Sequence, residues 1–335
     1  MMGTLCLAKI LAAASSSGVS PLSVMIYTLT LNPAIDLFID TNDLQPNQVN
    51  RTNGFQAQAN GKGVNVSFIL HRQDIPNTAW GIGGGFTLDY ITQVLTASGI
   101  PNAFVRCQGT TRINVFTHVR RTGQEFKQVN PGPAVTAEEL AQLWQQLEQL
   151  TAADCLIISG SFSQGIDPSI LVRIGQLAAE KKFKLVIDSS YPEVKAALPY
   201  HPFLIKPNDE ELKSWYGVTG EVDLGELLQL ARRAISEGAQ NVLLSLGGAG
   251  AAFITPTHTY VGNAPKIDVL NTAGAGDTML VTFIAGTVQG MAPAANLRYA
   301  IAAGSDTARS SWITDFTHVD ELLPQITIQT EEVDA

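Results

Sequence analysis

The segment with the clearest capacity for chemistry is a glycine-rich turn that ends in an acid, Gly274-Ala275-Gly276-Asp277. A helix is predicted directly after it, from about residue 278 to 288. Glycines let a ligand approach the backbone closely, and the unpaired N–H groups of a helix start attract an anion. Such a turn could stabilise charge on a transferring phosphoryl group, while the Asp277 carboxylate takes a proton from an attacking hydroxyl. The same aspartate could instead only cap the helix, so the motif alone leaves both interpretations open.

A second glycine cluster places a lysine at a predicted helix start. Asn60-Gly61-Lys62-Gly63 precedes residues 64–70, which are expected to be helical. Glycines weaken a helix, and a lysine gains nothing from the positive end of the helix dipole, so a bound anion would explain both residue types. The cluster is not a P-loop, because Gln56 stands where that motif needs glycine and Gly63 follows the lysine.

The elements that must position these turns are alternating apolar strands and amphipathic helices. Strands are predicted at residues 26–31, 155–159, 184–188, 203–206 and 241–246, and helices at 137–150 and 170–178. The first of these helices opens with a capping box, Thr136-Ala137-Glu138-Glu139, and the second follows Asp167-Pro168, an N-cap with proline at the first helical position. Continuously apolar strands require a sheet covered on both faces, so an α/β fold is expected.

Two polar, β-like segments interrupt this alternation, at about residues 36–55 and 112–129. The second is predicted to fold as a hairpin about Arg121-Thr122-Gly123-Gln124. Together they predict a small β-sheet attached to the core, which could serve as a lid or be an ordinary edge hairpin. Because no linker or repeat divides the chain, we expect a single domain over residues 25–325 with a tail at 326–335.

The composition is that of an acidic chain able to bury a core. Of 335 residues, 45% are apolar and 15% charged, which excludes disorder as the main state. Lys plus Arg number 21 and Asp plus Glu number 30, for a net charge of −9. Without a basic run, no nucleic-acid partner is expected, since nucleic acids call for clustered cations. A small anionic substrate held by a few local cations remains compatible with this charge.

Residues 1–24 differ from the rest and are treated as an extension of unknown role. Lys9 interrupts their apolar stretch, no basic start precedes it, and the stretch is too short to cross a bilayer. A targeting segment and an upstream extension both stay open, and no membrane partner is expected. Cys6, Cys107 and Cys155 are too few for a disulfide framework and too far apart for a metal knuckle, which predicts a reducing cytoplasm.

A series of short motifs follows in order between Met25 and about Leu323. They are Thr30-Leu31-Asn32-Pro33-Ala34-Ile35-Asp36, Val49-Asn50-Arg51, Asn60-Gly61-Lys62-Gly63-Val64-Asn65-Val66-Ser67, Thr111-Arg112-Ile113-Asn114-Val115, Ser159-Gly160-Ser161, Lys206-Pro207-Asn208-Asp209-Glu210-Glu211, Ser245-Leu246-Gly247 and Gly274-Ala275-Gly276-Asp277. In this order they resemble the ribokinase-like (pfkB) carbohydrate kinases, and within them the group of 1-phosphofructokinase and tagatose-6-phosphate kinase. The resemblance implies a three-layer α/β/α core with a mostly parallel sheet and a small β-sheet lid. It also implies a kinase that uses ATP and Mg²⁺ to phosphorylate a ketohexose monophosphate.

The resemblance further implies a role for each matched residue. The catalytic group would be the general base Asp277 with an anion hole made by Gly274, Ala275 and Gly276. The sugar hydroxyls would be bound by Asp36, Gly61 and Asn65, and the phosphate of the substrate by Arg51, Lys62, Arg112 and Ser161. ATP would be held by Lys206, Asn208, Glu211, Ser245, Gly247, Gly250 and Gly276, with Asn208 and Glu211 organising Mg²⁺ through water.

Several positions depart from the family pattern. Asn60 stands where glycine is usual, so the backbone there must accept a side chain. Asn130 runs directly into Pro131-Gly132-Pro133, without the acid that many relatives carry. The loop after Ser161 lacks a double proline, and Ala273 replaces a common valine.

Each implied role has a purely structural alternative. Asp36 could cap a turn, and Asn65 could be a polar residue of the first helical turn. Arg51 and Arg112 could be surface charges of the lid, which usually contribute little to stability. Asn208 and Glu211 could simply open the helix that follows them.

Fructose 1-phosphate, converted to fructose 1,6-bisphosphate, is the first substrate that the resemblance suggests. Tagatose 6-phosphate and fructose 6-phosphate are alternatives, because local cations explain a phosphosugar but not which carbon bears the phosphate. A non-catalytic sugar-phosphate sensor is the alternative of a different class, although such a protein is expected to lose Asp277 or the Asn-x-x-Glu pair. A dehydrogenase is disfavoured, because Phe86 follows the glycines of residues 81–85 where a dinucleotide fingerprint needs glycine. Exposed lid edges could pair two chains into a homodimer.

Overall fold

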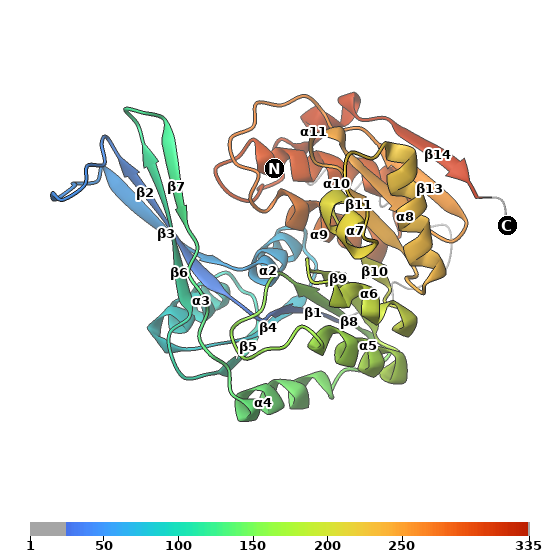
Figure 1. Ribbon diagram of the computed structural model, residues 1–335, viewed down its shortest axis with the longest axis horizontal. Coiled ribbons are helices and arrows are strands. Elements are labelled where there is room, and N and C mark those ends of the chain that lie inside the picture. The colour runs from blue at the N-terminus through green and yellow to red at the C-terminus, as the bar shows by residue number, and fades with distance from the viewer. Residues whose placement is uncertain (1–24, 334–335) are drawn as a thin grey trace.

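A ten-stranded sheet forms the middle layer of the protein (Figure 1). The computed structural model describes residues 25–333, so the expected extension at residues 1–24 lies outside the described residues. The strands lie in the order β14-β13-β12-β11-β10-β9-β8-β1-β4-β5. Their bounds are β1 Met25–Thr30, β4 Asn77–Gly83, β5 Asn102–Arg106, β8 Asp154–Ser159, β9 Lys184–Asp188, β10 Leu204–Ile205, β11 Val242–Ser245, β12 Ala251–Ile254, β13 His258–Gly262 and β14 Ile328–Glu332. Neighbours from β5 to β11 pair in parallel and those from β11 to β14 antiparallel, which confirms the mostly parallel sheet.

Helices cover both faces of this sheet. One face carries α2 Lys62–Arg72, α3 Gly85–Ala97, α9 Ala275–Val288, α10 Pro293–Ala308 and α11 Val319–Leu322. The other carries α4 Ala137–Leu147, α5 Ile170–Lys181, α6 Glu193–Ala197, α7 Asp209–Trp215 and α8 Leu224–Ser236. Side chains alternate between the two faces of a strand, so Ile157 of β8 packs in one core and Leu156 in the other. The predicted α/β/α layering is therefore confirmed.

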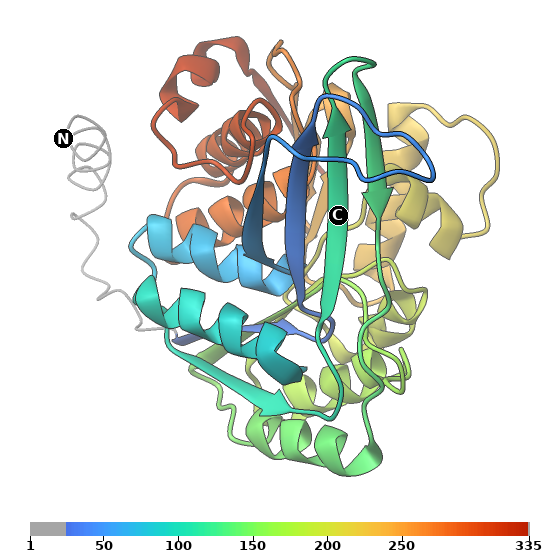
Figure 2. The ribbon, with the colours of Figure 1, turned by 90° about the vertical axis from the view of Figure 1, so that its left-hand side faces the viewer.

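A separate four-stranded sheet stands away from the core and faces one end of it (Figures 1 and 2). Its order is β3-β2-β6-β7, with β2 Ala34–Thr41, β3 Gly54–Asn60, β6 Arg112–Val119 and β7 Gln124–Gln128. The predicted hairpin is confirmed, because β6 and β7 pair antiparallel across residues 120–123. We call this sheet the lid. Its first segment extends from residue 34 to residue 60, further than the expected 36–55, because β2 from Ala34 to Asp40 pairs with the whole of β3.

Several element boundaries differ from the expected ones. α2 begins at Lys62 and α9 at Ala275, so Lys62 and Asp277 both lie in first turns rather than before their helices. The N-cap of α5 is Ser169, whose N–H donates to the Asp167 carboxylate at 2.8 Å. The capping box of α4 is confirmed, with Thr136 and Glu139 each accepting the other's backbone N–H.

The expected tail at residues 326–335 is wrong as far as Glu332, because β14 pairs with β13 and closes one edge of the sheet. Ile326 just before it is 2% exposed, so apolar burial fixes this end of the chain onto the core. Within the described part of the chain, no helix has the length and apolarity that a membrane crossing needs.

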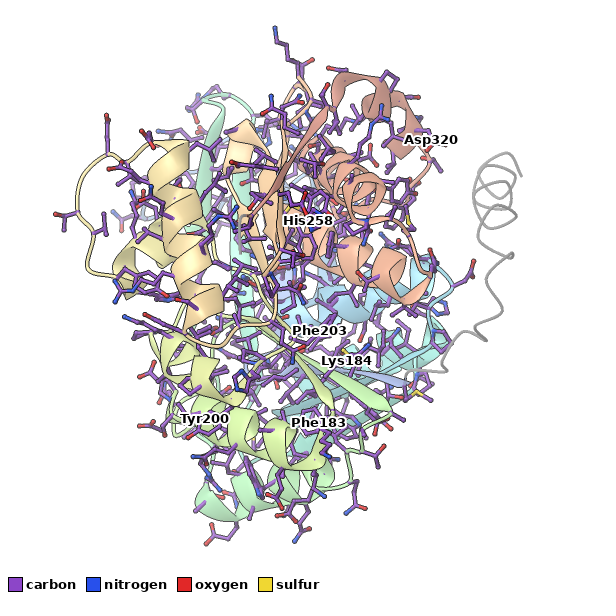
Figure 3. All side chains as sticks on the ribbon, turned by 90° about the vertical axis from the view of Figure 1, so that its right-hand side faces the viewer. Phe183, Lys184, Tyr200, Phe203, His258 and Asp320 are labelled. Carbon is purple, nitrogen blue, oxygen red and sulfur yellow. The ribbon has the colours of Figure 1, made fainter. Side chains whose placement is uncertain are left out.

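The two ends of the parallel strands differ in character. At the start of β9, the Lys184 ammonium lies 5.1 Å from the centre of the Phe203 ring, a surface contact between neighbouring segments (Figure 3). At the carboxyl end of the same strand, Asp188 is fully buried. Ligands of open α/β sheets bind beside the carboxyl ends of the strands, so a binding site is expected at the end of the sheet where Asp188 lies.

Candidate functional site

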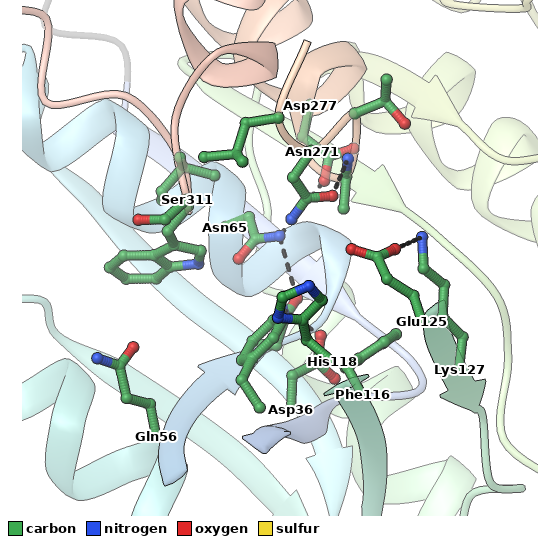
Figure 4. A pocket seen from close by; sticks show the side chains of 18 of the residues that line it. Asp36, Gln56, Asn65, Phe116, His118, Glu125, Lys127, Asn271, Asp277 and Ser311 are labelled. Carbon is green, nitrogen blue, oxygen red and sulfur yellow. Dashed lines mark hydrogen bonds and ion pairs between the residues drawn. The ribbon is translucent and has the colours of Figure 1, made fainter. Parts of the chain in front are cut away.

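A cavity of about 910 Å³ lies between the lid and the carboxyl ends of the core strands (Figure 4). The lid contributes its four strands, and the core contributes the start of α2, the turn before α9 and residues 311–313. This cavity brings together the predicted residues Asp36, Lys62, Asn65, Lys206, Asn208, Ser245, Gly274, Gly276 and Asp277. Residues distant in the sequence therefore line one cavity.

The turn before α9 presents Asp277 to the cavity from the first turn of the helix. Gly274 is the N-cap with a φ of 80°, a left-handed conformation that favours glycine. The Ala275 N–H donates to the Thr272 carbonyl at 3.2 Å, so it is already engaged. The N–H groups of Gly276 and Asp277 belong to the first turn, where a helix supplies no carbonyl partner, and they are the donors this turn can offer an anion.

Asp277 is buried at 4% exposure among charged groups. Its carboxylate lies 4.0 Å from the Lys62 ammonium and accepts a long 3.5 Å hydrogen bond from the Asn65 amide. Burial raises the pKa of Asp277 above its usual value, and Asp188 adds to this, whereas Lys62 and Lys206 act in the opposite direction. A carboxylate whose charge is poorly solvated is a better proton acceptor, which suits a general base.

Asp188 is a component of the site that the sequence did not reveal. It ends β9, is fully buried, and binds the Lys206 ammonium at 3.0 Å and the Lys62 ammonium at 3.4 Å. Burial alone would raise the pKa of Asp188, but the two ammonium groups outweigh burial and hold that pKa below its usual value. The signal available beforehand was its place at the carboxyl end of a predicted strand.

A second cavity, of about 320 Å³, shares Lys62 with the first and is also lined by Arg112 and Ser161. The Arg112 guanidinium donates to the backbone carbonyls of Asn32 at 3.2 Å and Asn130 at 3.4 Å. Burial lowers the pKa of Arg112, and Asp36 opposes this shift. Near this cavity, three buried polar atoms have no hydrogen-bond partner in the structure, namely Thr30 Oγ1, Ser159 Oγ and Arg112 Nε. A small anion such as a phosphate would satisfy donors of this kind.

At the base of the lid, Asp36 accepts hydrogen bonds from both neighbouring strands. The Asn114 amide of β6 donates to one carboxylate oxygen at 2.8 Å, and the Asn60 amide of β3 donates to the other at 2.6 Å. Asp36 is 8% exposed, and burial raises its pKa while Asn114 and Arg112 partly compensate. Its place in a paired strand rules out the turn-capping alternative for Asp36.

Asn208 and Glu211 form a capping box at the start of α7. The Asn208 side chain accepts the Glu211 N–H at 2.7 Å, and the Glu211 carboxylate accepts the Asn208 N–H at 3.0 Å. The structural alternative for this pair is therefore present, but it engages only one oxygen of Glu211. Glu211 also acts electrostatically on Lys62, where it helps to raise the lysine pKa. Asn208 lines the larger cavity, whereas Glu211 lines neither cavity.

Magnesium would have to be held here mainly by groups other than protein side chains. Among the described residues, no cluster of three or more His, Cys, Asp or Glu side chains could hold a metal ion. Mg²⁺ prefers oxygen ligands, keeps several waters and is often bound through one or two carboxylates plus substrate phosphates. A single carboxylate at Glu211 beside an amide at Asn208 fits that mode of binding.

The remaining predicted residues fall into two groups, namely glycines that packing requires (Gly61 and Gly250) and exposed residues (Gly247 and Arg51). Gly61 has a φ of 120°, and a Cβ there would come within 2.9 Å of the Thr30 side chain, so glycine is needed between β3 and α2. Gly250 lies between β11 and β12, where a Cβ would overlap the Gly262 carbonyl, so its glycine has a packing reason. Gly247 opens the same turn and is exposed. Arg51 is exposed before β3 and lines neither cavity, so the structure does not bring it to the other cations.

The chain is similar to known proteins over the residues that line both cavities. Residues 26–314 match the family described as pfkB family carbohydrate kinase. The D-tagatose-1-phosphate kinase of Bacillus licheniformis is 40% identical over 304 residues, which are 91% of this chain and 99% of that protein. The 1-phosphofructokinase of Bacillus subtilis is 31% identical over 304 residues, again 91% and 99% of the two chains. A crystal structure of phosphofructokinase-2 from Escherichia coli in complex with substrates and products has a TM-score of 0.82 at 26% identity, covering 90% of this chain and 99% of that one.

Proposed function

Because the chain belongs to the pfkB family of carbohydrate kinases, we propose that it transfers the γ-phosphoryl group of ATP to a ketohexose 1-phosphate, with fructose 1-phosphate as its substrate and fructose 1,6-bisphosphate as its product. One observation carries the proposal. A buried carboxylate, Asp277, faces a cavity that adjoins a second one lined by Lys62 and Arg112. The second cavity is suited to the phosphate already on the sugar, and the first to the reacting hydroxyl and ATP. Both relatives named above have a 1-phosphate in their names, which supports this position of the phosphate.

The proposed reaction is a direct transfer in which Asp277 accepts the proton of the sugar hydroxyl. The hydroxyl oxygen bonds to the γ-phosphorus as the bond from that phosphorus to the β,γ-bridging oxygen breaks, and ADP leaves. The N–H groups of Gly276 and Asp277, with Lys62 and Lys206, offset the charge on the phosphoryl group. The Asp188 carboxylate lies 3.0 Å from the Lys206 ammonium and 3.4 Å from the Lys62 ammonium. These ion pairs hold both lysine side chains in place before the substrate binds.

The ATP side of the cavity is assigned to residues at the carboxyl ends of β10 and β11. We infer that Lys206, Asn208 and Ser245 face the phosphates, with the turn of Gly247 and Gly250 bordering the nucleotide. Mg²⁺ would neutralise phosphate charge when bound there, with Asn208 and Glu211 holding its waters. The oxygen of Glu211 that is free of the capping box supports this assignment.

Replacing Glu211 with glutamine is expected to raise the Mg²⁺ concentration needed for half-maximal rate by about tenfold or more, since ligands that act through a metal's waters carry such effects. Glutamine can still accept the Asn208 N–H, so the helix cap survives. The matched control is Glu226→Gln, because Asp223 and Glu226 form the same capping box in α8 away from both cavities. Equal Mg²⁺ requirements for the two variants would contradict the assignment of Glu211.

Arg112→Ala is expected to raise KM for the phosphosugar by about 10- to 100-fold, the usual cost of a hydrogen bond between charged groups, with KM for ATP little changed. Steady-state kinetics with each substrate varied in turn measures this. Arg106→Ala is the control, because Arg106 pairs with Asp89 on the surface, where both side chains are 60% exposed. Equal losses for phosphosugar and ATP would argue against a substrate-phosphate role for Arg112.

The experiment that tests the function is a panel of hexose monophosphates assayed for ATP-dependent product formation. We expect the highest kcat/KM with fructose 1-phosphate. Tagatose 1-phosphate is the second candidate, because the relative from Bacillus licheniformis is 40% identical. Preference for fructose 6-phosphate or tagatose 6-phosphate would overturn the proposed position of the phosphate. Binding of a phosphosugar without turnover would identify a sensor instead.

We also propose that two chains pair through their lids in the cytoplasm. The outer strands β3 and β7 have unpaired edges, and Phe55 and Phe126 on them are 71% and 43% exposed. Open strand edges with apolar side chains invite pairing. A sedimentation mass equal to one chain would refute the dimer. The free, buried thiols of Cys107 and Cys155 suit a reducing compartment.

A further inference from the structure

Asn60 lies at the junction between the lid and the core, and its side chain reaches three neighbours. Its amide nitrogen donates to Asp36 at 2.6 Å. Its amide oxygen accepts the Gly61 N–H at 2.6 Å and the Asn65 amide at 3.1 Å. These three partners are the positions assigned above to the sugar hydroxyls. A glycine at this place could make none of these side-chain contacts.

The contact with Asp36 limits how that carboxylate can turn. In the β2–β3 ladder, Asn60 pairs with Ala34 and Gln58 pairs with Asp36, so Asn60 reaches Asp36 diagonally on the same face. Asn114 holds the other carboxylate oxygen from β6 at 2.8 Å. With one donor on each oxygen, the plane of the carboxylate is fixed, and each oxygen keeps room to accept one hydroxyl. Asn60 and Asn114 therefore hold the Asp36 carboxylate from opposite sides, in one orientation.

The contact with Asn65 extends this control toward the reacting group. The same Asn65 nitrogen that donates to Asn60 lies 3.5 Å from the Asp277 carboxylate. The Asn65 oxygen is buried and has no hydrogen-bond partner among the described residues. Asp36, Asn60, Asn65 and Asp277 thus form a continuous series of hydrogen-bonded side chains from the lid to the first turn of α9. Figure 4 shows Asp36, Asn65 and Asp277 of this series.

We propose that Asn60 is a positioning residue that determines which ketohexose 1-phosphate the enzyme prefers, by fixing the carboxylate of Asp36 against the ring hydroxyls. This inference rests on the proposed function. Fructose and tagatose differ only in the configuration at C4, so their C3 and C4 hydroxyls are trans in one and cis in the other. A carboxylate held in one plane accepts only one of these arrangements well, whereas a free carboxylate turns to accommodate either.

The test compares kcat/KM for fructose 1-phosphate and tagatose 1-phosphate in the wild type, Asn60→Gly and Asn60→Asp. Asn60→Gly removes all three side-chain contacts. Asn60→Asp keeps the shape but replaces the donor facing Asp36 with an acceptor. The matched control is Asn53→Gly, because Asn53 makes a similar 3.1 Å bond to Asp40 at the far end of the same two strands. Thermal unfolding of each variant reports whether the lid and core remain folded.

We expect the ratio of the two kcat/KM values to move toward one by about fivefold or more in both Asn60 variants, consistent with the loss of a single hydrogen bond. KM for ATP should stay near the wild-type value, and Asn53→Gly should keep the wild-type ratio. An unchanged ratio in a folded Asn60 variant, or the same change in Asn53→Gly, overturns the inference while leaving the proposed function intact. A wild type that phosphorylates neither sugar phosphate overturns the proposed function and the inference together.

Discussion

Replacing Asp277 with asparagine is expected to lower kcat by about 10² to 10⁴, the range that general-base catalysis contributes. Asparagine keeps the size of the side chain and can still contact Asn65 and Lys62, so the cavity should retain its shape. What is lost is the capacity to accept the proton of the sugar hydroxyl. Because the Gly276 N–H and Lys206 remain, the affinity for ATP should be close to that of the wild type.

The pH dependence of the wild type offers a second measure of the same group. The proposed base must be ionised to accept a proton, so kcat/KM is expected to fall as the pH is lowered through the pKa of Asp277. Burial raises that pKa, so the acid limb should lie above about pH 3.9, the ordinary value for aspartate. The limb should be absent from the residual activity of Asp277→Asn. Asp320→Asn is the control, since Asp320 is exposed in the first turn of α11 (Figure 3). Turnover near the wild-type rate in Asp277→Asn would exclude Asp277 as the base.

Removing the Asp188 side chain is expected to cost about 3–5 kcal/mol of the free energy of unfolding, as when one partner of a buried ion pair is deleted. Asp188→Ala leaves the Lys206 ammonium without its partner at 3.0 Å, and that lysine side chain is only 6% exposed. Lys62 contributes less, because its side chain is 41% exposed and water screens it. Urea unfolding of the wild type and the variant measures the difference.

The control for Asp188 is an ion pair on the surface. Asp89→Ala breaks the 2.7 Å pair with Arg106, and such exposed pairs contribute about 0–1 kcal/mol. Lysines hold the pKa of Asp188 below its usual value, so its contribution is present above the unfolded pKa of about 3.9 and disappears as the pH falls through the folded pKa. The stability difference between the wild type and Asp188→Ala should therefore narrow in acid. A loss no larger than that of Asp89→Ala would show that Asp188 is not needed to hold the lysines.

The turn with Asp277 could be predicted because its local sequence carries the chemistry. Glycines, an acid and a helix start lie together in residues 274–277, and no distant contact is needed to recognise them. Asp188 could not be predicted in the same way, because an acid at the end of an apolar strand has many uses. Its role follows only from the sheet order, which places β9 beside β10 and brings Lys206 to it, while α2 supplies Lys62.

The position of Arg51 and the strand at residues 328–332 could not be predicted from sequence patterns. Arg51 lies in the long loop between β2 and β3, and the residues beside it in the sequence carry no pattern that predicts how far this loop extends from the core. The structure leaves it exposed, away from Lys62 and Arg112. Residues 328–332 alternate too weakly to predict a strand, and their pairing with β13 is decided by the free edge of the sheet.

The lid is a four-stranded sheet built from two separate excursions of the chain, one between β1 and α2 and one between β5 and α4. Each excursion leaves the core and returns to it, and the parallel pairing of β2 with β6 joins the two. A single flexible loop must lose much conformational freedom when it closes over a ligand, at about 1–2 kcal/mol for each backbone residue that becomes ordered. The lid, whose backbone is already hydrogen-bonded in a sheet, has little conformational freedom left to lose. Closing this lid should therefore be a rotation of a preformed body, so that most of the binding free energy of the sugar remains available for selecting and orienting it.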